Sequence, residues 1–145
     1  MFSDLLRRLT APEPQRLPDT DARLALGALL VRLARSDGDY AATEIAQIDH
    51  VLMRRYGLDQ AGAQDLRAQC ETLEAEAPDT VRFTRAIKDA VSHEDRLAVI
   101  EAMWAVVLSD GVRDEAEDSL MRMVAPLLGI TDQESHRARL RVSAG

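Results

Sequence analysis

The sequence predicts an all-α fold, because helix-forming residues dominate it and strand-forming residues are scarce. Alanine provides 22 of the 145 residues and leucine 19, while valine, isoleucine and threonine together reach 22 and aromatic residues only 3%. Alanine and leucine are strong helix formers, whereas strands favour β-branched and aromatic side chains. Hydrophobic residues make up 46% and charged residues 30%, the balance of a globular protein. The length suits one domain.

The first 18 residues are predicted to form an arm outside that domain. Apolar residues recur at i, i+3, i+4 and i+7 over residues 2–9, the pattern of a short amphipathic helix. Prolines at positions 12, 14 and 18 then exclude regular structure before residue 19. We expect the arm to dock on the domain or to fray; the alternative is a peripheral contact with a membrane surface. The domain itself is predicted to span residues 19–142.

The first half of the domain is predicted to contain four helices. The first carries an apolar stripe over residues 24–33, and the second carries one over residues 45–52 and stops near Gly57, a natural C-terminal cap. Asp59 caps the third helix, which is expected to fray over residues 71–76, an acidic stretch interpreted as a solvated face. Pro78 separates it from a fourth helix around Ile87.

Three further helices are predicted in the second half. Ser92, with Asp95 three residues later, resembles a capping box and opens a strongly apolar helix that ends at residue 108. Asp114 with Glu117 forms a cap-and-N3 arrangement for the next helix, which Pro126 is expected to kink or shorten. Thr131 caps the last segment.

Charge and motif content exclude several classes of function. The net charge of −7 argues against nucleic acid, whose binding depends mainly on neutralising phosphates. No secretory leader or membrane-length apolar run occurs, and the lone Cys70 suits a reducing compartment, so we expect a cytoplasmic protein, with the inner face of the membrane as a peripheral alternative. No zinc-helix spacing, nucleophile elbow, P-loop or dinucleotide motif is present, which predicts a protein without catalytic activity or organic cofactor.

An internal repeat organises the domain. A shift of 73 residues aligns positions 24–60 with positions 97–133 and gives 9 identities over 37 ungapped positions. The identities include Ser-Asp-Gly at 36–38 and 109–111, a Glu at 44 and 117, and Asp-Gln at 59–60 and 132–133. We interpret the repeat as two helical hairpins related by a pseudo-two-fold, with the helices around Cys70 and Ile87 as the connection.

Both copies contain the pattern D-G-x5-E at the junction of the two helices. A purely structural role, with no ligand, explains the glycine, which lets the chain reverse direction. It also explains the glutamate, which lies near N3 of the second helix and accepts backbone N–H bonds there. It explains Asp37 and Asp110 poorly, because an acid at a helix C-terminus meets the negative end of the helix dipole. A bound cation is one compensation for that charge.

The same spacing occurs at positions 5, 6 and 12 of an EF-hand, but an EF-hand is excluded. Its first and third ligands would be Leu33 and Arg35, or Val106 and Leu108, which cannot bind calcium. A looser oxygen site is compatible with Asp37, Asp39 and Glu44, or with Asp110, Asp114 and Glu117. Calcium, magnesium and manganese accept such carboxylates, with water completing the shell. Pure helix capping remains the other interpretation.

At these residues the sequence resembles the TerB family, small all-helical domains associated with bacterial tellurite resistance. The resemblance rests on residues 34–38 with Glu44, on residues 108–111 with Glu117, and on Arg96 at the head of the intervening helix. It covers roughly residues 19–140 and is similar to the stand-alone forms. Ala41 and Tyr40 depart from the family pattern in the first loop, so the second loop, with five acids between Ser109 and Ser119, is the better candidate.

The resemblance implies about seven to eight helices with pseudo-two-fold symmetry, no enzymatic activity, and a divalent cation held by acidic loops. Its metal candidates are Asp37, Glu44, Asp110 and Glu117; Asp114 joins them from the loop composition. It also implies a protein partner in a stress-response or membrane-associated complex, with a homodimer as an alternative. A metal-independent interaction scaffold, in which the loops only cap helices, is the second hypothesis.

Overall fold

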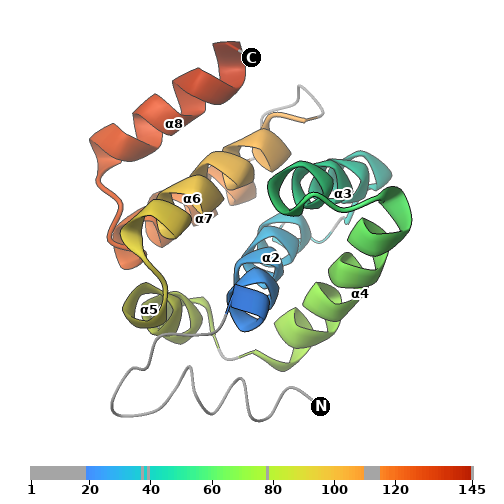
Figure 1. Cartoon of the computed structure of the whole chain (residues 1–145). Helices are drawn as coiled ribbons and strands as arrows, with labels where there is room; N and C mark the ends of the chain where they lie inside the picture. The colour runs from blue at the N-terminus through green and yellow to red at the C-terminus, as the bar shows by residue number, and fades with distance from the viewer. Residues whose placement is uncertain (1–18, 37, 39, 78, 110–114, 145) are drawn as a thin grey trace.

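A computed structural model describes residues 19–36, 38, 40–77, 79–109 and 115–144. These ranges contain seven helices and no strand, which confirms the all-α prediction (Figure 1). The predicted arm over residues 1–18 lies outside the described residues. The helices are α2 (Asp19–Arg35), α3 (Ala42–Tyr56), α4 (Gln60–Glu76), α5 (Thr80–Ala90), α6 (His93–Val107), α7 (Glu115–Leu127) and α8 (Asp132–Ala144). None of these helices is long and apolar enough to cross a bilayer.

Helix α2 lies at the centre of the domain and packs against α3, α4, α6 and α7 (Figure 1). Every residue from 24 to 31 is buried, so the helix is enclosed around its circumference rather than along one stripe. A helix that is apolar on all sides is stable only in such a position. On the other side of the domain, α8 packs along α6.

Local capping signals fix where the helices begin. The Asp59 carboxylate accepts a hydrogen bond from the Gly62 N–H at 2.7 Å, and the Ser92 hydroxyl accepts one from the Asp95 N–H at 3.4 Å. Thr131 and Glu134 form a complete capping box. The Thr131 N–H donates to the Glu134 carboxylate and the Glu134 N–H donates to the Thr131 hydroxyl, both at 3.0 Å. These three caps confirm the sequence predictions. Helix α7 ends at Leu127, one residue after Pro126.

Residues 71–76 differ from the prediction of a frayed, solvated stretch. Helix α4 continues to Glu76, and the Glu74 side chain is only 13% exposed. Its carboxylate lies 3.3 Å from Arg35 Nη1, and Arg32 donates a hydrogen bond to the Glu74 carbonyl oxygen at 3.2 Å. The prediction was wrong because these partners lie on α2, about 40 residues earlier in the chain. The two arginines also place positive charge at the C-terminal end of α4, where the helix dipole favours it.

Helices α2 and α4 approach closely at Gly27. A Cβ atom at this position would lie 2.4 Å from the Cys70 Sγ, so only a hydrogen atom fits there. Cys70 is buried in the core, and burial raises the pKa of its thiol to about 12. The helix around Cys70, predicted as part of a connection between two hairpins, therefore forms one side of the central packing.

Arg96 joins the C-terminal ends of two other helices. Its Nε donates a hydrogen bond to the carbonyl oxygen of Val91, the C-cap of α5, at 3.0 Å, and its Nη1 donates to the carbonyl oxygen of Leu128, which follows α7. A guanidinium group suits this position because it presents several donors in a fixed geometry and adds positive charge at two helix C-termini. Gly129 makes room for it: a Cβ there would lie 2.7 Å from Arg96 Nη1.

We expect Gly27→Ala to destabilise the protein through its contact with Cys70, although alanine is the better helix former by about 1 kcal/mol. Overpacking a filled core costs about 1–3 kcal/mol. The double variant Gly27→Ala/Cys70→Ala removes the colliding sulfur and should be more stable than the sum of the two single changes allows. Urea unfolding measured by circular dichroism tests this coupling, and strictly additive free energies would contradict the packing role of Gly27.

Replacement of Arg96 by lysine should lower the free energy of unfolding by about 1–3 kcal/mol, since one ammonium group cannot replace both charge-assisted hydrogen bonds to carbonyl oxygens. Arg85→Lys, an exposed site on α5, is the matched control and should change the stability by about 0.5 kcal/mol or less. Equal urea midpoints for the two variants would show that Arg96 holds neither helix end.

Candidate functional site

The structure describes two of the five predicted metal ligands. Glu44 and Glu117 belong to the described residues, whereas Asp37, Asp110 and Asp114 lie outside them. The described residues at each Asp-Gly loop are therefore mainly those of the helix that precedes the loop and of the helix that follows it.

The two loops are entered through the same turn. Ser36 Oγ donates a hydrogen bond to the Leu33 carbonyl oxygen at 2.7 Å, and Ser109 Oγ donates to the Val106 carbonyl oxygen at 2.7 Å. The backbone N–H groups of the two serines bond to the same acceptors at 3.1 and 3.2 Å. Each pair of equivalent residues is 73 positions apart. Both serines thus help to terminate a helix.

Glu44 and Glu117 are the third residues of α3 and α7, the N3 positions expected from the sequence. Their exposed fractions are 3% and 2%, and among the described residues they are the two acids with buried side chains. Glutamate is almost never fully buried unless its charge is compensated. The positive end of each helix dipole supplies part of that compensation. The repeated loops therefore each end in a carboxylate withdrawn from solvent, which the sequence pattern alone did not predict.

Helix α3 begins without a side-chain cap from its N-cap residue. Ala41 has an extended backbone (φ −72°, ψ 151°) and contributes no side-chain hydrogen bond. An alanine N-cap leaves the first N–H groups of a helix to other acceptors, and a glutamate at N3 is one of the groups that serve them. Helix capping thus remains a physical explanation for Glu44 alongside cation binding.

The first loop is followed by a polar network that the sequence did not reveal. Tyr40 is half-buried, with the Arg35 guanidinium 5.1 Å from its ring centroid. Burial raises the pKa of the Tyr40 hydroxyl, and the Glu71 carboxylate adds to the rise. Arg67 joins Glu71 at 3.2 Å and Asp49 of α3 at 2.6 Å. Tyr40, which departs from the family pattern, was the only sequence signal for this link between the loop and α4.

The repeat loses its register before the end of the second helix of each copy. Helices α3 and α7 are both followed by a glycine with positive φ, 63° at Gly57 and 74° at Gly129. The N–H of the residue after each glycine bonds to the carbonyl oxygen five residues earlier, from Leu58 to Met53 at 3.1 Å and from Ile130 to Ala125 at 2.8 Å. These pairs are 72 residues apart, not 73. The predicted equivalence of Asp59-Gln60 with residues 132–133 is therefore wrong by one position, because Thr131, not Asp132, matches the Asp59 N-cap.

No group of three or more His, Cys, Asp or Glu side chains within the described ranges is arranged to hold a metal ion. The described part of each loop contributes one carboxylate, and the remaining predicted ligands belong to residues that the structure does not describe. The chemistry available at each loop is thus one buried carboxylate at a helix N-terminus. Such a group can accept backbone N–H bonds or bind a hard cation.

Comparison with known proteins identifies the family. A family model described as tellurite resistance protein TerB matches residues 23–140. Neither the comparison with curated proteins nor the comparison with solved structures gave a match. The matched region contains most of α2, all of α3 to α7, both Asp-Gly loops and Arg96. Because the match extends over most of the 145 residues, the chain belongs to the TerB family.

Proposed function

We propose that this protein is a non-enzymatic binding module whose Asp-Gly loops hold a divalent cation. Asp37 and Glu44 are the proposed ligands in the first loop, and Asp110, Asp114 and Glu117 in the second. The observation that carries the proposal is the pair of buried carboxylates, Glu44 and Glu117, at the same position after each repeated loop. Membership of a family named for tellurite resistance supports a role in the response to stress.

The chemistry of the loops favours a hard cation. Calcium, magnesium and manganese prefer carboxylate oxygens and complete their coordination with water or backbone carbonyls. A carboxylate that is withdrawn from water attracts a cation more strongly than an exposed one, because the local dielectric constant is lower. The aspartates of the loops would supply the further negative charge that a divalent ion requires.

The second part of the proposal is a protein partner. In this proposal the domain acts by binding rather than by catalysis, and the family context supports a cytoplasmic stress-response complex, including one assembled at the inner face of a membrane. In this interpretation the cation stabilises the loops and the partner binds the surface that the helices form.

A metal-independent scaffold is the second candidate, and one observation favours it. Ala41 gives α3 no side-chain cap, so Glu44 at N3 is well placed to serve the helix N-terminus without any ion. The scaffold would bind its partner equally well in the presence of a chelator.

Thermal melts with chelator, calcium, magnesium or manganese separate the two candidates. Trp104 fluorescence is a suitable signal, because its indole N–H donates to Ser135 Oγ at 3.1 Å and so reports the packing of α8 on α6. An ion present at about 100 times its dissociation constant adds about 2.7 kcal/mol and should raise the melting temperature by several degrees. Glu117→Gln should abolish the increase while keeping the helix content measured by circular dichroism.

Glu134→Gln is the matched control for that variant. Glu134 is also an N3 glutamate, in the capping box of α8, and it lies outside the Asp-Gly loops. The Glu134→Gln protein should keep the full ion-dependent increase in melting temperature, although helix α8 loses part of its N-terminal capping. No shift with any of the three ions in the unmodified protein, together with equal losses of helix in the Glu117 and Glu134 variants, would assign the loops to capping alone.

A further inference from the structure

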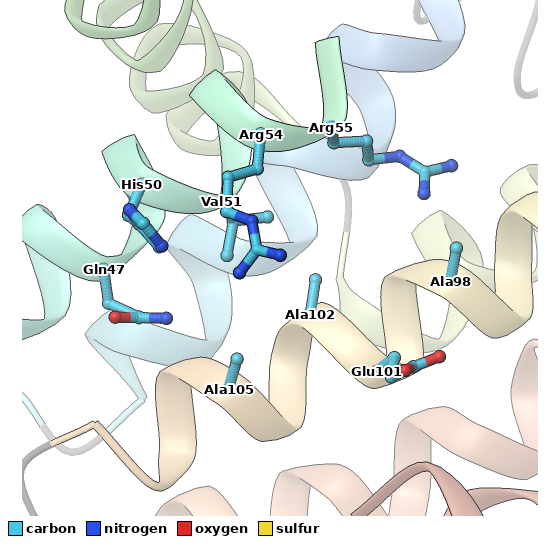
Figure 2. Close-up of a pocket in the computed structure, with 9 residues that line it drawn as sticks. All are labelled: Gln47, His50, Val51, Arg54, Arg55, Ala98, Glu101, Ala102 and Ala105. Atoms are coloured by element: carbon cyan, nitrogen blue, oxygen red, sulfur yellow. The ribbon is translucent and has the colours of Figure 1, made fainter. Parts of the chain in front are cut away.

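A groove between α3 and α6 lies outside the proposed cation site. It has a volume of about 520 Å³, and Figure 2 shows its two sides facing each other, with Gln47 opposite Ala105 and Arg55 opposite Ala98. The two helices therefore run antiparallel along it. The groove contains none of the five proposed metal ligands.

The floor of the groove consists of small side chains on one face of α6. Ala98, Ala102 and Ala105 are spaced four and three residues apart, so they line the same face of the helix, and each is only partly buried. Val51 adds an apolar group from α3. Alanine methyl groups leave room for a third helix to approach α6 at the 8–10 Å separation of packed helices.

The walls of the groove are basic, although the chain carries a net charge of −7. His50 and Arg54 are exposed on α3, and Arg55 lies beside them (Figure 2). Arg55 Nη2 lies 3.3 Å from Asp95, and the Glu101 carboxylate is bound by Arg141 of α8 at 3.4 Å. Among the residues that line the groove, two arginines, Arg54 and Arg55, therefore face one carboxylate, Glu101, which is already paired with Arg141 outside the groove.

This charge pattern selects the partner. A groove lined by arginines attracts an acidic segment and rejects a basic one, since complementary potentials determine which partner is accepted. A second copy of this chain is disfavoured as the occupant, because both copies carry the same net charge of −7.

We propose that the α3–α6 groove docks an acidic amphipathic helix of a partner protein. Small apolar residues of the helix pack on Ala98, Ala102 and Ala105, and carboxylates on its rim bind Arg54 and Arg55 by charge-assisted hydrogen bonds. The proposal deepens the partner role in the proposed function by naming the partner's chemistry, and it does not depend on the cation.

The test uses a synthetic acetylated peptide of about 15 residues, matching the length of α6, with alanine and leucine on one face and glutamate on the other. A second peptide carries lysine in place of each glutamate. Fluorescence anisotropy with the full chain should show binding of the glutamate peptide, weakened by added salt, and much weaker binding of the lysine peptide. Heteronuclear NMR should place the largest shift changes on α3 and α6.

Three variants assign the binding to the groove. Arg54→Glu should lower the affinity for the glutamate peptide about tenfold or more. Ala102→Leu should lower it as well, because the larger side chain fills the floor of the groove. Arg85→Glu makes the same charge change on the exposed face of α5 and should leave the affinity within about twofold. Equal affinity for the two peptides, no binding at millimolar concentration, or equal effects of Arg54→Glu and Arg85→Glu would overturn the proposal.

Two further measurements distinguish docking of an acidic helix in the groove from cation-dependent binding and from dimerisation. The affinity should be the same with chelator and in Glu117→Gln, so the groove result stands whether or not the loops bind an ion. Sedimentation without peptide should show a monomer at the concentrations used. A dimer that Arg54→Glu dissociates would overturn the proposal and assign the groove to a second copy of the chain.

Discussion

The separation of α2 and α4 at Gly27 is the constraint on which much of the structure depends. Helix α4 can lie close to the central helix only because no side chain separates Gly27 from Cys70. That closeness lets Glu74 meet the arginines of α2 and brings α4 to the polar network around Tyr40, beside the first Asp-Gly loop. The position of one loop is therefore linked to packing in the core.

Helix content and helix starts could be predicted because their causes are local. The caps at Asp59, Ser92 and Thr131 each involve residues only three positions apart, so the sequence contains both partners of every bond. The burial and ion pairing of Glu74 could not be predicted in this way, because its partners lie on another helix. The enclosure of α2 was likewise hidden, since an apolar stripe does not reveal how many neighbours will cover it.

The candidate site shows the same division. The N3 positions of Glu44 and Glu117 follow from the repeat, but their burial depends on neighbouring helices and required the structure. The one-residue loss of register arose because identical residues at 59–60 and 132–133 concealed a difference in helix length: Gly57 follows Glu44 by 13 positions, whereas Gly129 follows Glu117 by 12. The groove could not be predicted because its alanines, taken singly, are ordinary helix residues; only the arginines at the C-terminal end of α3 opposite them suggest a binding role.

The glycines that end α3 and α7 have similar backbones but different freedom to change. Asparagine tolerates the left-handed conformation and is the usual substitute for such a glycine. Around Gly57 no atom lies within 4 Å of a Cβ, so asparagine fits there. At Gly129 a Cβ would lie 2.7 Å from Arg96 Nη1 and 3.1 Å from Lys88 Cε, so asparagine fits only if these side chains move and Arg96 loosens its bond to Leu128. Two equivalent turns thus differ in how readily they accept a side chain, because one of them lies against the side chains of distant helices.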